Sequence, residues 1–330
     1  MDKNLVQLAV DSYKGVATGE YSTSERSETI RKAMIEMNGG SAVMDYRAIR
    51  DGKCNGLFAY IEDVLTQTVI EGLPEGNPLF DFVEQRNLKE GDQQKFLLEG
   101  KGSFIVSEIA DGTQGLRRQR LNAGEEITVK TKKHGVKIYE ELTRVLAGRV
   151  DFNKFIDMVA EAFIKQITEE MYEAVVAGFA GLATPYAESG SFNEATLLKI
   201  VDHVEAATGQ TAIILGSKQA VRKITGITGA DAKSAKEDLY AMGYFGHIGE
   251  NAVVTMKNGH KAGTTDFILG NDLYIIAADD KFVKYVTEGE SLIIPGNPTD
   301  NQDLSQEFLT IQCYGIKAIM SAINGVYRLS

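Results

Sequence analysis

The sequence of 330 residues has little of the chemistry that marks a metal centre or a redox site. It contains no tryptophan, five prolines, four histidines and two cysteines. Cys54 and Cys313 are far apart in the sequence and fit no metal-binding or redox spacing. No histidine has a second ligand at the i+4 position, the usual helical spacing for zinc. We therefore expect two free, buried thiols, no metal and no cofactor.

Long hydrophobic runs and an excess of positive charge are also missing. No window holds about 18 consecutive apolar residues, the minimum for a typical transmembrane helix. The first residues, MDKNLVQLAVDSYKGV, lack the pattern of a secretory signal. The net charge is −11, which disfavours nucleic-acid binding because affinity for phosphates depends on Lys and Arg. The length predicts about two soluble domains and no membrane partner.

Motifs of common enzymes are absent as well. The chain has no GxSxG elbow, no GxxxxGK[ST] loop and no GxGxxG loop. The segment TAIILGSKQAVRKITG comes nearest, because a strand ends there at Gly216–Ser217 and a helix follows. Such a helix start can bind an anion, which leaves open a cytosolic α/β enzyme with an anionic ligand. The simpler interpretation is a strand–helix connection with Ser217 as the N-cap, and we predict that the chain is not an enzyme.

Helical segments with many breaks fill residues 1–91. SERSETIRKAMIEMNGG predicts a helix that Gly39–Gly40 end, and residues 57–70 predict a second amphipathic helix. This part of the chain has few core residues. We therefore expect an arm that packs on another surface.

Residues 92–138 favour an extended ribbon of two strands. FLLEG and EEITVKT predict strands, and the long polar stretch between them joins the two. The dipeptide His134–Gly135 predicts a turn, after which Val136 and Ile138 continue the apolar alternation. Isolated hairpins are marginally stable in water, so we expect this ribbon to lie on another surface.

The tip of this ribbon, TQGLRRQR, concentrates positive charge. Its arginines are Arg117, Arg118 and Arg120. We expect them to pair with carboxylates on a neighbouring copy of the chain, because guanidinium–carboxylate hydrogen bonds are strong. A contact with nucleic acid and a solvated loop are the alternatives.

The longest helical pattern covers about residues 151–182, where apolar residues recur at three- and four-residue steps. About 29 helical residues extend over roughly 43 Å, more than the width of a small domain. This helix needs a sheet or other helices along its length, whereas Glu169, Glu170 and Glu173 are expected in solvent. The expected packing residues are Phe152, Phe155, Ile156, Val159, Phe163, Ile167, Met171, Val175 and Phe179.

The remaining sequence divides into an α/β pattern over residues 190–262 and a return to strands over residues 263–330. Asn258–Gly259 and Asn324–Gly325 are typical of two-residue hairpin turns. We expect the C-terminal strands to supply the sheet on which the long helix packs.

The order of these parts resembles that of the major capsid proteins of tailed bacteriophages, which have the HK97-like fold. The segment EEITVKTKKHGVKIYEELTRVLAGRVDFNKFIDMVAEAF carries the local resemblance: a strand, a turn, a short EEL segment and the start of a long helix. The resemblance covers the chain from about residue 92 onward. It implies an α+β fold with an N-terminal arm (1–91), an E-loop hairpin (92–138), a P-domain with the spine helix (139–189 and 263–330) and an α/β A-domain (190–262).

The same resemblance implies a structural function. Many copies would assemble, as pentamers and hexamers, into an icosahedral or prolate head shell that encloses double-stranded DNA without sequence-specific binding. Scaffolding, portal and decoration proteins are the further partners that it implies. The expected location is the virion, after assembly in the host cytoplasm. The alternative of the same fold is an encapsulin-like nanocompartment.

Overall fold

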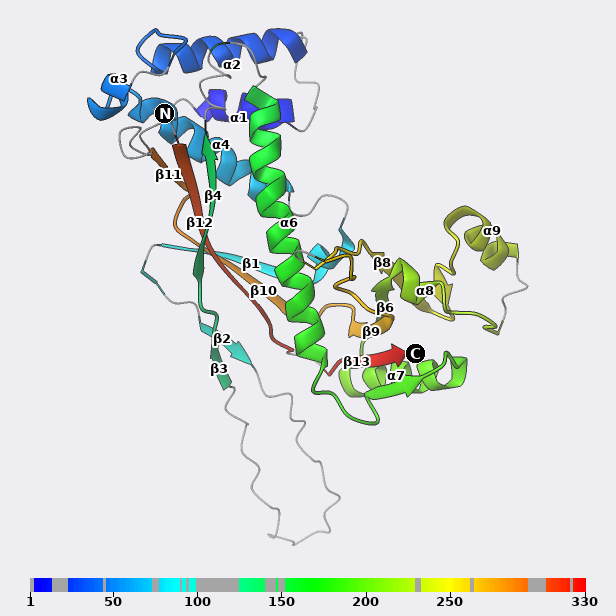
Figure 1. Cartoon of the computed structure of the whole chain (residues 1–330). Helices are drawn as coiled ribbons and strands as arrows, with labels where there is room; N and C mark the ends of the chain where they lie inside the picture. The colour runs from blue at the N-terminus through cyan, green and yellow to red at the C-terminus, as the bar shows by residue number, and fades with distance from the viewer. Residues whose placement is uncertain are drawn as a thin grey trace, which may run out of the picture.

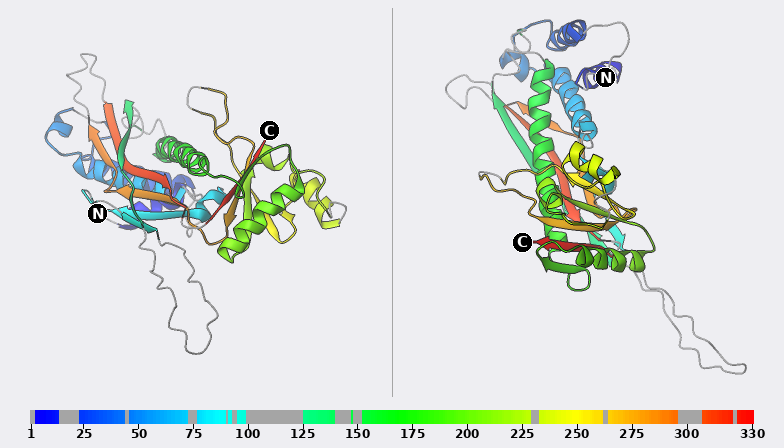
Figure 2. Two further views of the ribbon diagram at one scale, coloured as in Figure 1. Left: turned by 90° about the horizontal axis from the view of Figure 1, so that it is seen from below. Right: turned by 90° about the vertical axis from the view of Figure 1, so that its right-hand side faces the viewer.

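A long helix organises the structure. The computed structural model describes residues 3–13, 23–43, 46–72, 77–89, 91–92, 95–98, 125–139, 147, 152–228, 233–261, 264–295, 307–320 and 323–330. Within them, helix α6 (Phe152–Phe179) runs from a group of N-terminal helices to the junction of two sheets (Figure 1). Seen from below, α6 stands end-on between the sheets (Figure 2). Helices and mixed sheets confirm the predicted α+β class.

The N-terminal helices gather at the first turns of α6 (Figure 1). They are α1 (Lys3–Tyr13), α2 (Thr23–Met37), α3 (Tyr46–Arg50) and α4 (Asn55–Gly72). As predicted, α2 ends at Gly39 and Gly40, which adopt left-handed φ angles of 75° and 82°. The expected scarcity of core residues is wrong here, because Ile30, Met34 and Ile61 are fully buried in one core with α6.

A five-stranded sheet lies along one side of α6. A short 3₁₀ helix, η1 (Pro78–Phe82), leads into β1 (Val83–Leu88), which pairs in parallel with β10 (Val283–Glu288). The central strand β12 (Glu307–Ala318) pairs antiparallel with β10 and β11 (Leu292–Pro295), and also with β4 (Lys132–Tyr139).

The predicted turn at His134–Gly135 is wrong. Both residues lie inside β4, where His134 is paired with Gln312 and Gly135 with Ile311. The ladder with β12 therefore continues through the glycine, and this pairing overrides its local preference for turns.

A six-stranded sheet forms the second layer of strands. Its order is β5 (Ala187–Gly190), β13 (Gly325–Leu329), β9 (Asp272–Ala277), β6 (Ala212–Ser217), β8 (Asn251–Met256) and β7 (His247–Ile248). Helices α7 (Glu194–Thr208) and α8 (Lys218–Val221) pack on it, and α9 (Lys233–Met242) projects away (Figure 1). Strands from residues 263–330 are thus divided between the two sheets.

The hairpins predicted at two Asn-Gly pairs are wrong. Strands β8 and β9 flank β6 in the sheet, so a two-residue turn after β8 cannot join them. Instead, the Asn258 side chain donates to the Leu269 carbonyl and accepts from the Leu269 amide, at 2.7 and 2.9 Å. At the second pair, Gly325 begins β13 directly after a chain crossing from the other sheet.

The described residues include the base of the expected two-stranded ribbon. Strands β2 (Lys95–Leu98) and β3 (Glu125–Thr128) form an antiparallel pair, below the five-stranded sheet in Figure 1. Residues 99–124, which include the tip arginines Arg117, Arg118 and Arg120, lie outside the described residues.

Candidate assembly surface

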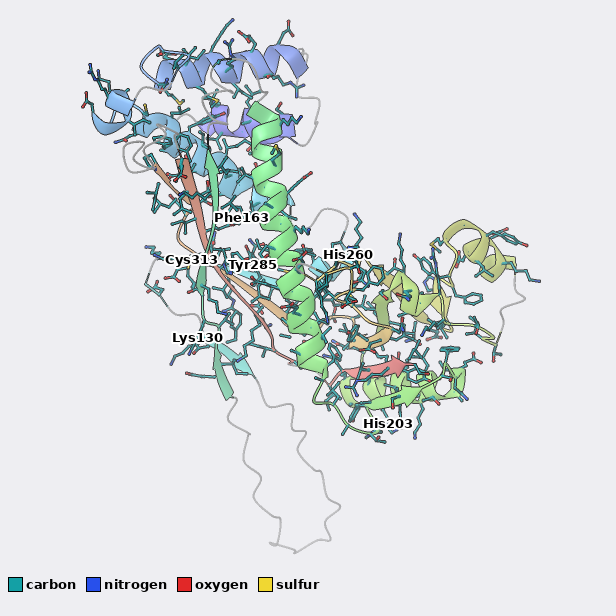
Figure 3. All side chains as sticks on the ribbon, viewed as in Figure 1. Lys130, Phe163, His203, His260, Tyr285 and Cys313 are labelled. Carbon is teal, nitrogen blue, oxygen red and sulfur yellow. The ribbon has the colours of Figure 1, made fainter. Side chains whose placement is uncertain are left out.

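The inner face of α6 is the rigid support for the surfaces described below. Phe163 on α6 and Tyr285 on β10 are both buried in the layer between helix and sheet (Figure 3). At the far end, the Phe179 ring contacts the rings of Tyr274 and Phe282, with centroids 4.9 and 5.6 Å away. The buried members of the expected packing set are Ile156, Val159, Phe163, Ile167, Met171, Val175 and Phe179. Phe152 and Phe155 lie in α6, and their side chains are outside the described residues.

One acidic residue of α6 faces the sheet. Glu170 Oε1 lies 3.2 Å from His134 Nε2 and accepts a hydrogen bond from the Tyr314 hydroxyl at 3.4 Å. The His134 and Tyr314 rings stack with their centroids 4.0 Å apart. The expectation of three solvated glutamates is therefore wrong for Glu170, because β4 supplies polar partners at that edge of the helix. It is also wrong for Glu169, whose side chain is only 15% exposed. Glu173 is exposed as expected.

The outer face of the five-stranded sheet, opposite α6, holds the root of the ribbon. Phe96 of β2 is 4% exposed and packs with Val129 against Val286. The Arg86 guanidinium lies 4.6 Å from the centre of the Phe96 ring, and Lys284 Nζ lies 5.5 Å from it. These cations face the electron-rich surface of the ring. The base of the ribbon therefore packs on the five-stranded sheet of its own chain. This is the surface on which the expected hairpin lies.

The other half of this outer face is apolar and exposed. Leu292 and Ile294 of β11 are 51% and 43% exposed. Their partners across the ladder are Ile311 and Leu309 of β12, and directly paired side chains lie on the same face of a sheet. We call these residues, Leu292, Ile294, Leu309 and Ile311, the outer stripe.

Lysines border the outer stripe. Lys137 of β4 is paired with Leu309, and Lys133 is paired with Cys313. Lys133 and Lys137 are both exposed, as is Lys130 at the root of the ribbon (Figure 3). Lys137 also makes an ion pair with Glu307. The stripe thus combines an apolar centre with a border of lysines, of which Lys137 is paired with a carboxylate of its own chain.

The ribbon is also tied to the sheet by a carboxylate. Glu288, at the end of β10, accepts a hydrogen bond from the Gly91 amide at 2.8 Å and another from the Thr131 hydroxyl. The Thr131 hydroxyl first, and then the Gly91 amide, lower the pKa of Glu288 below its usual 4.5. Sequence analysis missed this residue, because its partners are 197 and 157 positions away and no local motif surrounds it.

The hydroxyl at the Gly216–Ser217 turn is occupied by hydrogen bonds within the chain. Ser217 is 1% exposed; its hydroxyl accepts from the Ala220 amide at 3.1 Å and donates to the Gly270 carbonyl at 2.9 Å. The predicted N-cap is confirmed, and α8 has only four residues. The geometry gives no support to the anion-binding enzyme.

The described residues contain no group of three or more His, Cys, Asp and Glu side chains placed to hold a metal ion. No helix in that same part of the chain is long and apolar enough to cross a membrane. Neither cysteine forms a disulfide; Cys54 is buried as expected, whereas Cys313 is half-buried at the outer face.

Comparison with known families decides where this fold belongs. Residues 4–322 match the family model of the SPbeta prophage-derived putative capsid protein YonB. The chain belongs to this capsid-protein family. No curated protein matches the sequence.

Solved phage capsids share the fold. The capsid structure of cyanophage P-SCSP1u aligns with a TM-score of 0.52 and 10% identity, over 77% of this chain and 88% of that chain. The mature capsid of bacteriophage PhiM1 aligns with a TM-score of 0.50 and 9% identity, over 77% and 87%. The HK97-like capsid fold expected from the sequence is thus confirmed.

Proposed function

We propose that this chain is the major head-shell protein of a tailed phage or prophage. The match of residues 4–322 to a prophage capsid family carries this proposal. Many copies form a closed shell, built from pentamers and hexamers, that encloses double-stranded DNA without reading its sequence. The protein is located in the virion after assembly in the host cytoplasm. The prophage origin of the family favours this function over an encapsulin-like compartment.

We further propose a division of labour along the chain. Residues 1–91 are the N-terminal arm and residues 92–138 the E-loop, except that β1 and β4 belong to the P-domain sheet. The P-domain comprises α6 and the five-stranded sheet. The A-domain comprises the six-stranded sheet, so that β9 and β13 join residues 190–262 in it. The shared ladders of β9 with β6 and β13 support this assignment.

The outer stripe is proposed as the surface that receives a neighbouring copy. Exposed apolar patches on soluble proteins commonly mark contact sites. The adjoining half of the same sheet face is already covered by the ribbon base of its own chain, through Phe96 and Val129. The lysines that border the stripe favour an acidic neighbour, and the chain itself carries a net charge of −11. Many such weak contacts in one lattice give a stable shell.

The tip arginines, Arg117, Arg118 and Arg120, are proposed to pair with carboxylates of a neighbouring copy. Scaffolding, portal and decoration proteins are proposed as further partners. We propose no catalytic role, because the one enzyme-like turn is occupied by its own Ser217 hydrogen bonds.

The direct test is assembly of the full chain. Light scattering and negative-stain microscopy of the expressed protein are expected to show megadalton shells. Substitution of both Leu292→Asp and Ile294→Asp should abolish shells and leave the melting temperature of the unassembled protein nearly unchanged. Met158→Asp, at a side chain that is 58% exposed on α6, is the control and should assemble.

Two outcomes would contradict these proposals separately. A wild-type protein that remains a stable monomer or dimer would exclude the head-shell function. Normal shells from the Leu292→Asp, Ile294→Asp variant would exclude the outer stripe as a contact and leave the general function in place.

A further inference from the structure

The carboxylate of Glu288 touches both ends of the segment that carries the ribbon. Its Oε1 accepts from the Gly91 amide, just before β2, and its Oε2 accepts from the Thr131 hydroxyl, just after β3. The ribbon therefore enters and leaves the sheet at one side chain. Hydrogen bonds to an ionised acceptor are stronger than those between neutral groups.

The chain segments that connect β2 and β3 to the sheet, at residues 91 and 130–131, have tight backbone geometry. Gly91 adopts a left-handed φ of 89° within a turn closed by the Asp92 amide and the Lys89 carbonyl, 3.1 Å apart. On the other side, the chain at Lys130 crosses directly over Gly315 of β12. A Cβ atom at Gly315 would lie 2.4 Å from the Lys130 carbonyl oxygen, so any side chain there would lift the crossing.

Two kinds of interaction thus hold the ribbon, and they differ in direction dependence. The packing of Phe96 and Val129 on Val286 is apolar, and apolar burial is non-directional. It keeps the ribbon base on the sheet but permits rotation. The hydrogen bonds of Glu288 are directional. They bind a residue before β2, Gly91, and a residue after β3, Thr131. They are the contacts that can fix an angle.

We propose that Glu288 is a positioning residue that clamps both connections of the ribbon and so sets the direction in which β2 and β3 leave the sheet. This inference rests on the proposed head-shell function, because the ribbon's direction matters only if it meets a neighbour. When the hydrogen bonds of Glu288 break, the ribbon can rotate about residues 91 and 131, while Phe96 stays packed on the sheet.

Charged and titratable groups near the clamp fit this role. Lys133 of β4 is the cation that acts on Glu288, and the Cys313 thiol of β12 donates to Glu288 Oε2 at 3.6 Å. The ionised form of Glu288 is favoured by its hydrogen bonds, so the clamp is closed at neutral pH. Cys313 is half-buried beside it and reports on the position of Thr131.

Hydrogen exchange of the unassembled full chain tests the clamp directly. Thr131→Val, which removes one hydrogen bond to the carboxylate, is expected to accelerate amide exchange in β2, β3 and Val129 by about tenfold. Glu288→Ala removes both hydrogen bonds and should accelerate exchange at least as much. Because Glu288→Ala already removes the Thr131 contact, the double variant should exceed Glu288→Ala only slightly. Glu290→Ala, two residues away and exposed, should exchange like the wild type.

Alkylation of Cys313 provides a second readout, measured in a Cys54→Ser background. Loss of the Thr131 hydroxyl without opening of the clamp should leave the alkylation rate close to that of the wild type, because burial raises the pKa of the Cys313 thiol in both proteins. Opening of the clamp would accelerate alkylation, because the Thr131 connection moves off the thiol. Faster alkylation in Thr131→Val therefore supports the clamp, and an unchanged or slower rate contradicts it. Thr131→Val also keeps the side-chain shape, so the test survives if Glu288→Ala folds poorly.

Assembly separates this inference from the function on which it rests. If wild-type shells form, Glu288→Ala and Thr131→Val should yield shells of broader size distribution in electron micrographs than Glu290→Ala. If the wild type forms no shells, the head-shell proposal fails, and the exchange data still decide on the clamp. Acceleration confined to the Gly91 amide, with uniform shells, would overturn the inference.

Discussion

His134 of β4 and Glu170 of α6 meet across the contact between sheet and helix, with Nε2 and Oε1 3.2 Å apart. The Tyr314 hydroxyl donates to the same glutamate oxygen, at 3.4 Å. One carboxylate therefore links β4 and β12 to the long helix. A helix residue that looks solvated in the sequence is part of the joint between two layers.

Replacement of Glu170 should weaken this joint. Glu170→Ala leaves the Tyr314 hydroxyl without its acceptor, and a buried polar group that loses its partner costs about 1–3 kcal/mol. Urea unfolding of the unassembled protein measures the loss. The matched control is Glu173→Ala on the exposed face of α6, expected within about 0.5 kcal/mol of the wild type. Equal losses in both variants would contradict the joint.

The apolar face of α6 should carry much more of the stability. Phe163 is buried between helix and sheet, and Phe163→Ala is expected to lower the free energy of unfolding by about 3–5 kcal/mol because it leaves a cavity. Met158→Ala, on the exposed side of the same helix, should cost less than about 0.5 kcal/mol. Calorimetry or urea unfolding compares the two. A small loss at Phe163 would mean that the core beneath α6 collapses to fill the space.

Replacement of Gly325, at the start of β13, should lower the stability because there is no space for a side chain. A Cβ atom at Gly325 would lie 2.5 Å from the Ile200 side chain of α7 and 3.2 Å from the Tyr186 carbonyl. Gly325→Ala is therefore expected to cost about 1–3 kcal/mol through overpacking. Gly181→Ala, where nothing lies within 4 Å, should be neutral or slightly stabilising. Thermal unfolding of the two variants gives the comparison.

Features of the fold that depend on residues close together in the sequence could be predicted from the sequence. The long helix, the glycine stop of α2 and the Ser217 cap depend on residues within a few positions of each other, and the structure has all three. The resemblance to the HK97-like capsid fold was based on the order of such elements.

Contacts between strands that are far apart in the sequence could not be predicted from it. His134–Gly135 predicts a turn by itself, and only the ladder with β12 makes it a strand. Likewise, Asn324 looks like a turn residue, whereas its side chain is buried and donates to Asp280 at 2.9 Å. The outer stripe needs the pairing of β11 with β12, and the Glu288 clamp needs three separate segments. No local pattern encodes either one.

Removal of the ribbon tip should separate folding from assembly. Deletion of residues 112–121, which takes out Arg117, Arg118 and Arg120, is expected to leave a soluble folded protein that forms no shells. Circular dichroism checks the fold, and electron microscopy checks assembly. A variant with all three arginines changed to glutamine is the milder control for charge alone. Normal shells from the deletion would contradict the proposed intersubunit role of the tip.

Acid should open the Glu288 clamp, and the sign follows from its pKa. The Thr131 hydroxyl and the Gly91 amide hold the pKa of the folded carboxyl below the usual 4.5, so the ionised form is the one that folding favours. The contribution of the clamp is complete above the pKa of the unfolded chain and is lost as the pH falls through the lower folded value. We therefore expect the ratio of exchange rates between Glu288→Ala and wild type, measured in β2 and β3, to be large at pH 7, to fall below pH 4.5 and to approach one once the pH has passed the lower folded pKa. The ratio cancels the intrinsic pH dependence of exchange. A ratio that stays constant over this range would show that the charge of Glu288 does not hold the ribbon.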